Sequence, residues 1–321
     1  MNLVERIREL KRKRKAVLLA HYYQRAEVQD IADIVGDSLK LAIEAARTDA
    51  EVVVFCGVHF MAETAAITCP DRVVLLPDAN SGCPMADMCH PRELAELKSR
   101  YPDAVVVSYV NSSAAVKAQS DICCTSANAV KVMKSVPTDR PVIFVPDRWL
   151  GQYAAERAGR SRLIWADSTR DLAEREGEGA PVVLWDGYCH VHHHILPEFV
   201  REAMAKHPEA ELCAHPECRD EVVKMARFTG STGQILAWCS SSEHREFLIA
   251  TEEGILHPLR KANPDKTFHP VTSLAVCHDM KLVTLEKILW ALEDMEPRVT
   301  VEAETAAGAR KAIDAMLALS A

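Results

Sequence analysis

Short apolar runs alternate with amphipathic stretches along most of the 321-residue chain. Apolar runs of a few residues that end at Gly, Pro, Asp or His are typical of strands buried in a parallel sheet, and apolar positions three and four residues apart are typical of helices. Strands are expected at 16–20, 52–55, 73–76, 104–108, 142–145, 182–185, 211–214, 247–250 and near 266–270. Helices are expected at 2–14, 39–47, 60–67, 151–158, 285–292 and 306–319. This alternation predicts an α/β fold.

The same order of elements occurs three times along the chain. In each pass, a residue at the end of a strand is followed by a hydroxyl residue at an expected helix start, and the interval between the two is the same. The pairs are His21 and Ser38, Tyr109 and Ser126, and His215 and Thr232. Each pass closes with a cysteine. Cys83 and Cys277 lie equally far along the chain from the first member of their pairs, and Cys189 lies farther from its own. The surplus length of the middle pass matches an acidic, Gly-containing insertion around 171–179. Matched intervals of this kind indicate an internal repeat of supersecondary units.

The repeat predicts three αβα units, each a small parallel sheet covered by helices. We expect these units to span 1–84, 85–190 and 191–280 and to surround a central site as pseudo-threefold relatives. Residues 281–321 are expected to form closing helices that pack on the first unit. Because open α/β sheets place their chemistry at the carboxyl ends of the strands, the residues that follow the strands are the candidates for a shared site.

A pseudo-threefold arrangement would bring the equivalent residues together. Ser38, Ser126 and Thr232 would then begin helices whose N-termini point inward. Free backbone N–H groups and partial positive charge at helix N-termini favour anions, so the central cavity suits a small substrate with carboxylate or phosphate groups. Each of these residues taken alone is explained as a plain N-cap. The interval that the three pairs share argues against three unrelated caps.

The three repeated cysteines are candidate metal ligands. Structural zinc normally takes four protein ligands in short paired spacings, and no Cys-x-x-Cys occurs in the chain. Three cysteines on a [4Fe–4S] cluster leave one iron open, which can act as a Lewis acid. Buried apolar positions are expected for Cys56, Cys69, Cys123, Cys124, Cys213 and Cys239, whereas Cys89 and Cys218 fit either interpretation.

The densest group of ligand-type residues is the run from Cys189 to His194. On an extended segment, alternation would place Cys189, Val191 and His193 on one side and the remaining histidines on the other. Such a run could bind zinc or copper by itself, either adventitiously or as a built site. Gly-rich nucleotide loops and a Gly-x-Ser-x-Gly nucleophile elbow are absent from the sequence.

Charge and composition narrow the class of protein. A net charge of −8 argues against a general nucleic-acid binder. The basic run 11–15 is interpreted as a solvated helix end, with a phosphate-binding tail as the alternative. Neither a signal peptide nor a bilayer-spanning apolar stretch is evident, and 11 cysteines, an odd number, do not suggest a disulfide framework. These features predict a protein of the reducing cytoplasm.

Short motifs occur in a fixed order along essentially the whole chain. They are Ala20-His21-Tyr22-Tyr23-Gln24, Gly36-Asp37-Ser38, residues 57–64, Ser81-Gly82-Cys83, residues 108–111, residues 125–129, Cys189-His190-Val191-His192, His215-Pro216-Glu217-Cys218, residues 229–232 and Cys277-His278-Asp279-Met280. Together they resemble the quinolinate synthase family (type A), iron–sulfur enzymes of bacterial NAD biosynthesis. The histidines after His192 depart from the family pattern.

The resemblance implies a [4Fe–4S] cluster on Cys83, Cys189 and Cys277 and the condensation of iminoaspartate with dihydroxyacetone phosphate to quinolinate, phosphate and water. It implies a cytoplasmic enzyme with small-molecule substrates, with the enzyme that produces iminoaspartate as a transient contact, and without nucleic-acid or membrane partners. Residues implied to bind carboxylate or phosphate oxygens are His21, Ser38, Ser126, His215, Ser231 and Thr232. The implied catalytic residues are Tyr109, Glu217 and His21, with Tyr23, Asn111 and His192 lining the pocket.

Two other functions fit the residues. A non-catalytic metal or redox sensor would use the cysteines and the histidine run, and a sugar-phosphate binding protein would simply bury its cysteines. Independently of these functions, Glu217 next to Pro216 at a strand end has the alternative role of a surface carboxylate in a salt bridge. Iron and sulfide content after oxygen-free purification separates these alternatives, because an iron–sulfur cluster is brown and its open iron makes it labile in air.

Overall fold

The computed structural model describes residues 2–166 and 173–320. The first sheet is parallel and has the strand order β2 (Ile34–Gly36), β1 (Ala16–His21), β3 (Val52–Cys56) and β4 (Val73–Leu75). Its helices are α1 (Leu3–Arg14), α2 (Ala26–Ile31), α3 (Ser38–Arg47) and α4 (His59–Thr68), and α5 (Pro84–Asp87) follows. Strand β3 is buried along its whole length, because helices cover both faces of this sheet.

The second sheet has the order β6 (Ile122–Cys124), β5 (Val105–Tyr109), β7 (Val142–Val145), β10 (Val182–Trp185), β8 (Leu163–Ala166) and β9 (Ala173–Arg175). Its neighbours are parallel except for β8 and β9, which are antiparallel. Helices α6 (Pro91–Arg100), α7 (Ala114–Lys117), α8 (Ala129–Ser135) and α9 (Arg148–Arg157) accompany it. The predicted insertion around 171–179 lies partly outside the described residues, and its described part contains β9.

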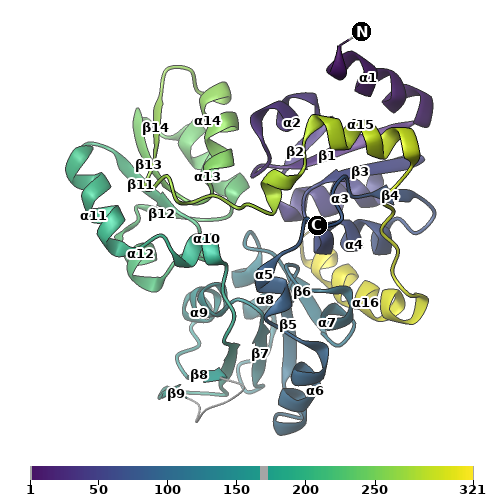
Figure 1. The fold of residues 1–321 in the computed structure, drawn as a ribbon. Helices are drawn as coiled ribbons and strands as arrows, with labels where there is room; N and C mark the ends of the chain where they lie inside the picture. The colour runs from purple at the N-terminus through teal and green to yellow at the C-terminus, as the bar shows by residue number, and fades with distance from the viewer. Residues whose placement is uncertain (1, 167–172, 321) are drawn as a thin grey trace.

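The third sheet is parallel, with the order β12 (Phe228–Thr229), β11 (Glu211–Ala214), β13 (Glu246–Ala250) and β14 (Thr267–Pro270). Its helices are α10 (His190–His193), α11 (Pro197–Lys206), α12 (Asp220–Met225), α13 (Thr232–Ser241) and α14 (Leu256–Ala262), with a 3-10 turn η1 (Glu253–Ile255) before α14. Figure 1 shows the resulting sheets with their helices arranged around a common centre.

The predicted α/β architecture of three αβα units is confirmed, because each sheet begins with the same order of a short edge strand, an inner strand and a middle strand. The edge strands β2, β6 and β12 were not predicted. They contain three, three and two residues, too few for a periodic pattern to reveal. The boundaries 1–84, 85–190 and 191–280 remain a prediction.

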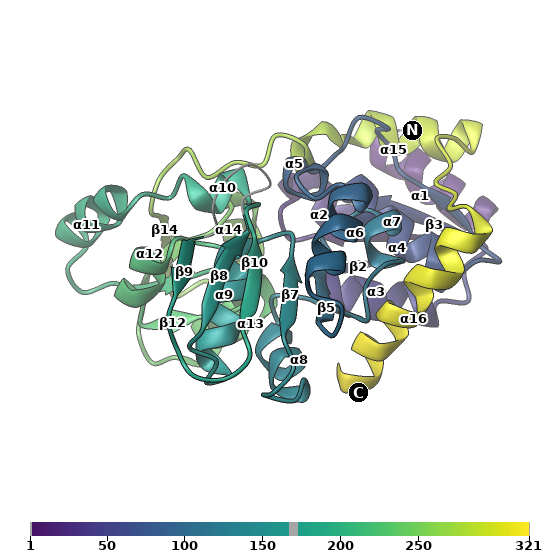
Figure 2. The same ribbon diagram turned by 90° about the horizontal axis from the view of Figure 1, so that it is seen from below.

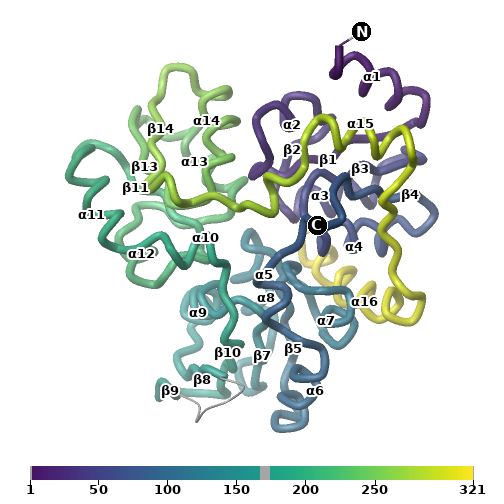
Figure 3. The backbone as a smooth tube through the Cα atoms, in the orientation of Figure 1, coloured from purple at the N-terminus to yellow at the C-terminus, as the bar shows by residue number. Residues whose placement is uncertain are grey.

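The two C-terminal helices pack in different places. Helix α15 (Leu285–Asp294) packs on α1 and β3, whereas α16 (Ala303–Ser320) packs on α4 of the first unit and on β6 and α7 of the second (Figure 2). The expectation that residues 281–321 pack on the first unit therefore fits α15 and only part of α16. Figure 3 shows the chain between β14 and α15 crossing from the third unit to the first through a 3-10 turn, η2 (Met280–Leu282).

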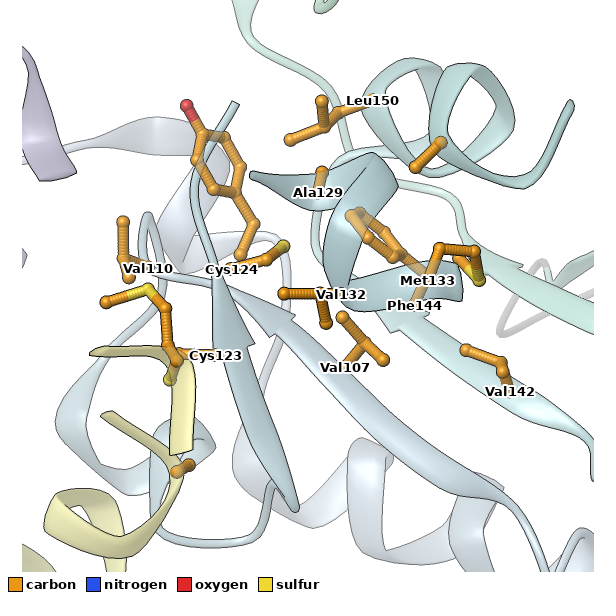
Figure 4. Close-up of a cluster of buried hydrophobic side chains, with 14 of the residues drawn as sticks. Val107, Val110, Cys123, Cys124, Ala129, Val132, Met133, Val142, Phe144 and Leu150 are labelled. Atoms are coloured by element: carbon orange, nitrogen blue, oxygen red, sulfur yellow. The ribbon is translucent and has the colours of Figure 1, made fainter. Parts of the chain in front are cut away.

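The core of the second unit shows how the sequence pattern becomes packing. Val107 and Phe144 on its strands meet Val132 and Met133 on α8, and all four are fully buried (Figure 4). Cys123 and its neighbour in β6 lie among them, as predicted for cysteines that act as small apolar side chains. No helix in the part of the chain that the structure describes is long and apolar enough to cross a membrane.

Candidate active site

A pocket of about 670 Å³ is lined by segments of all three units. Its walls are formed largely by residues that follow strands, as expected for parallel sheets. The residues predicted for the site that line it are His21, Tyr23, Ser38, Cys83, Tyr109, Asn111, Ser126, Cys189, His192, His215, Glu217, Thr232 and Cys277. Ser231, also predicted, lies outside this lining.

Three aromatic side chains occupy matching positions at the inner strands. His21 and Tyr109 are the last residues of β1 and β5, and His215 directly follows β11. Burial lowers the pKa of His21 to about 4 and that of His215 to about 3. Both imidazoles are therefore neutral near pH 7, and each can offer one hydrogen-bond donor and one acceptor.

Ser38 and Thr232, the repeated hydroxyl residues at the starts of α3 and α13, are not the caps of these helices. Asp37 caps α3 and Ser231 caps α13, so Ser38 and Thr232 are the first helical residues and turn toward the pocket. The two caps contact each other, because Ser231 Oγ donates to Asp37 Oδ2 at 3.0 Å. This contact and its cap role account for the position of Ser231 outside the lining.

Ser126 departs from the repeat. It lies in a turn three residues before α8, which begins at Ala129, so the expectation that it begins a helix is wrong. The turn is held by Asn128, whose Oδ1 accepts from the Thr125 backbone N–H at 2.7 Å. Ser126 Oγ instead contacts His215 Nε2 at 3.2 Å, across the boundary between the second and third units. Two helix N-termini, rather than three, therefore accompany the repeated hydroxyl groups.

Glu217 is the centre of a buried proton network. Tyr109 Oη donates to Glu217 Oε1 at 2.5 Å, and His192 Nδ1 lies 3.0 Å from Glu217 Oε2, although the ring is not aligned for a hydrogen bond. Burial opposes ionisation of Glu217, but contacts with His192 and His215 and the Tyr109 hydroxyl outweigh it and lower its pKa to about 2. Burial and the adjacent carboxylate raise the pKa of Tyr109 well above its usual value. A protonated phenol thus faces an ionised carboxylate.

The network continues through a residue that the sequence did not reveal. Thr251 Oγ1 lies 2.8 Å from His192 Nε2 and 2.7 Å from Tyr23 Oη, and Thr232 Oγ1 donates to Tyr23 Oη at 3.0 Å. Thr251 directly follows β13, and this position after a middle strand could have identified it as a site residue from the sequence. Asn111 Oδ1 is buried without a hydrogen-bond partner among residues 2–166 and 173–320. A buried amide oxygen of this kind in a pocket wall is suited to a ligand donor.

The three predicted cysteine ligands differ from the rest of the cysteines. Cys83, Cys189 and Cys277 line the pocket and are partly exposed, whereas the other eight are buried. Burial raises the pKa of Cys277 to about 12, and burial, with Glu217 and the other two thiols nearby, raises that of Cys189 well above its usual value. Three thiols in one pocket lose their protons when they become ligands, and a metal ion or an iron–sulfur cluster supplies the cationic partner that the thiolates then need. The donor set therefore fits the implied cluster.

Two buried carboxylates hold the loops that carry two of these cysteines. Asp147 Oδ2 accepts from the backbone N–H of Cys189 at 3.2 Å, and Glu252 Oε1 accepts from that of Cys277 at 3.1 Å. Both carboxylates are fully buried, and each stands two residues after the middle strand of its sheet. The sequence interpretation missed both, although this shared offset could have found them. The first unit has Val58 at the same offset from β3.

The histidine run is helical, so the predicted alternation is wrong. Residues 190–193 form α10, and Cys189 and His192 both line the pocket instead of lying on opposite sides. Cys189 Sγ, a ring nitrogen of His192 and a Glu217 oxygen lie within 4.8 Å of one another. His193 packs elsewhere, where Trp149 Nε1 donates to its Nδ1 at 3.0 Å. Within residues 2–166 and 173–320, the run does not form a metal-binding group of its own.

Comparisons with known proteins match one family along nearly the whole chain. The family model described as NadA, quinolinate synthetase A protein, matches residues 5–318. A quinolinate synthase of Desulforudis audaxviator is 51% identical over 317 residues, which cover 99% of this chain and 98% of that protein. Quinolinate synthase 1 of Methanosarcina acetivorans is 50% identical over 318 residues, covering 99% and 98% of the two chains. The quinolinate synthase of Trichodesmium erythraeum is 44% identical, covering 99% and 94%.

Proposed function

The chain belongs to the quinolinate synthase family of enzymes, and on this premise we propose that it condenses iminoaspartate with dihydroxyacetone phosphate to quinolinate, phosphate and water as a step of NAD biosynthesis. The observation that carries the proposal is the position of Cys189, which lies beside both His192 and Glu217. A group held by the three thiols would thus lie next to the buried proton network. Condensation and dehydration need this combination of a charge stabiliser and a proton carrier.

Cys83, Cys189 and Cys277 would hold the [4Fe–4S] cluster, since they are partly exposed in one pocket and no other cysteine is. When bound, such a cluster supplies one iron with an open coordination position that acts as a Lewis acid. The residues of the chain then bind the substrates, exclude water and move protons.

Substrate anions would bind where the hydroxyl residues Ser38 and Thr232 line the pocket. Ser38 and Thr232 are the first residues of α3 and α13, where backbone N–H groups lack helical partners. Neutral His21 and His215 can each donate one hydrogen bond to a carboxylate or phosphate oxygen, and Asn111 Oδ1 is left to accept one from a hydroxyl or imine N–H. These groups come from all three units, so they fix a small substrate from several sides.

Tyr109 and Glu217 would carry the acid–base steps. Glu217 is ionised and buried, so its Oε1 can take a proton from a substrate carbon or nitrogen that replaces the Tyr109 hydroxyl as its neighbour. Tyr109 keeps its proton at neutral pH and can donate it at Oη to a departing oxygen. His192 lies 3.0 Å from the Glu217 carboxylate and contacts Thr251, so a small rotation of its ring would connect the carboxylate to Thr251 and Tyr23.

Oxygen-free purification combined with a quinolinate assay tests the proposal. The expected protein is brown, contains about four irons and four sulfides per chain, and forms quinolinate from the two substrates. Cys189→Ser should lose iron and activity, whereas the matched control Cys69→Ser should keep both, since a hydroxyl can replace the Cys69 thiol in its contact with the Ala65 carbonyl. His194→Ala should also keep both.

Each failure has a distinct meaning. Quinolinate formation by a colourless, iron-free protein would refute the cluster assignment. An iron-loaded protein that forms no quinolinate would refute the reaction and leave the sensor function as the better interpretation.

A further inference from the structure

A second group of ligand-type side chains lies away from the pocket, on the third unit. His207 caps the C-terminus of α11, Glu246 begins β13 and His269 lies in β14. Glu246 Oε1 is 2.8 Å from His207 Nδ1 and 2.9 Å from His269 Nε2. The two imidazole rings stack with centroids 3.8 Å apart. We call these three residues the surface triad.

The arrangement concentrates three ligand atoms from separate elements at one point. All three atoms lie within 4.8 Å of one another, and in the described part of the chain one other group meets this condition, Cys189–His192–Glu217 in the pocket. Both imidazoles face the same carboxylate oxygen, which already accepts as many hydrogen bonds as its two lone pairs allow. Exposed carboxylate–imidazole pairs contribute little to stability by themselves, so stability alone gives a weak reason for this convergence.

We propose that the surface triad binds a divalent transition-metal ion such as Zn²⁺. Two imidazoles and one carboxylate are a ligand set that suits zinc, nickel or cobalt, whereas the thiols of the pocket suit an iron–sulfur cluster. A tetrahedral zinc ion with ligands at about 2.0–2.1 Å separates its ligand atoms by about 3.3 Å. The present distances of 2.8 and 2.9 Å from the carboxylate oxygen to the ring nitrogens would therefore lengthen by about 0.5 Å on binding, and the two ring nitrogens already lie within 4.8 Å of each other.

The proton balance of binding is simple. Each neutral imidazole keeps one N–H, and coordination at His207 Nδ1 and His269 Nε2 moves that hydrogen to the other ring nitrogen. The ion takes the place of both hydrogen-bonding protons on the carboxylate. The side chains are 31, 34 and 26% exposed for His207, Glu246 and His269, so an ion can enter and a water molecule can complete the coordination.

Binding would tie three elements of the third unit together. Along the chain, 39 residues separate His207 from Glu246 and 23 separate Glu246 from His269. The unfolded chain therefore does not hold these side chains together. An ion that binds the folded chain alone raises its stability by mass action. The site is independent of the cluster and of the proposed reaction.

Calorimetric titration of the oxygen-free, iron-loaded protein with Zn²⁺ tests the proposal, because a loaded cluster keeps the pocket thiols from binding zinc. One zinc per chain is expected, with a rise in the unfolding temperature. Glu246→Gln and His269→Asn should each weaken binding by about tenfold or more. The matched control is His244→Asn, which removes a histidine paired with Glu211 at 3.1 Å outside the triad and should bind zinc like the unchanged protein.

Two results would overturn the site. Wild-type protein that binds no zinc up to millimolar concentration has no such site. Equal zinc binding by the wild type and by both triad variants, each shown to be folded by circular dichroism and unchanged iron content, would place the metal elsewhere. Iron content and quinolinate formation are measured separately, so failure of the zinc site does not affect the proposed reaction.

Discussion

Two groups of the same composition, two imidazoles around one carboxylate, have opposite surroundings in this molecule. The pocket triad consists of His192, Glu217 and His215, and the surface triad of His207, Glu246 and His269. The rings stack in both, with centroids 4.5 and 3.8 Å apart. The pocket triad has side chains only 2–3% exposed, whereas the surface triad is about one third exposed.

The difference shows that burial, and not the residue types, decides which chemistry each triad can perform. In the pocket, burial lowers the pKa of His215 and keeps it neutral, and burial raises the pKa of Tyr109 so that it keeps its proton. Protons therefore pass among few and fixed partners. At the surface, hydrogen bonds from His207 and His269 lower the pKa of Glu246, and water competes for every contact. The first arrangement suits proton transfer, and the second suits capture of an ion from solution.

The largest expected effect comes from removing the charge of the pocket triad. Glu217→Gln keeps the size of the side chain but replaces the proton acceptor by an amide, so quinolinate formation should fall by about 10³-fold with iron content unchanged. Turnover numbers and iron analysis of the same preparation measure this. Glu198→Gln, which changes an exposed carboxylate on α11, is the control. A wild-type rate for Glu217→Gln would remove the acid–base role of the pocket triad.

Loss of the phenol next to that carboxylate should be the second largest effect. Tyr109→Phe removes the hydrogen bond of 2.5 Å to Glu217 and the proton at Oη, so turnover should fall by about 10²-fold. The cluster should remain, because Tyr109 is not among the thiol ligands. Unchanged turnover in this variant would contradict its role as the acid.

A smaller effect is expected where a buried carboxylate only positions a ligand. Asp147 caps α9 by accepting from the Leu150 N–H and also accepts from the Cys189 N–H, and Asp147→Asn leaves one oxygen for these two hydrogen bonds. The Cys189 loop should loosen, and the visible absorbance of the cluster should bleach several-fold faster in air. Asp186→Asn, on the loop that carries Cys189 but about half exposed, is the control and should bleach like the wild type. Equal bleaching in Asp147→Asn would show that the carboxylate does not position the ligand.

The smallest expected effect is on stability, which should fall at acidic pH because His21 is buried. His21 has a folded-state pKa of about 4 against an ordinary 6.5, so below pH 6.5 the unfolded chain binds the proton more readily and stability falls as the pH drops toward 4. This one group should cost about 2 kcal/mol of unfolding free energy between pH 7 and pH 5. Urea titrations at both pH values measure the loss, which His21→Asn should reduce. An equal loss in that variant would contradict the assignment.

The sequence by itself determined the architecture and the repeat. Apolar runs such as 182–185 are typical of strands covered on both sides, and the interval from His21 to Ser38 recurs unchanged in each unit. It also separated the three partly exposed cysteines from six that fill cores, and left Cys89 and Cys218, which are buried, undecided. These features are local or periodic, so each can be detected within the chain without knowing what it packs against.

Only the tertiary structure decided which side chains meet. It placed Thr232 in the pocket and its neighbour Ser231 against Asp37, folded the run after Cys189 into a helical turn, and set Asp147 behind that cysteine. The surface triad joins residues 39 and 23 positions apart. Such contacts depend on how whole sheets and helices pack. A shift of one residue along a helix turns a side chain by about 100°, from pocket to cap, while the hydrophobic pattern stays the same.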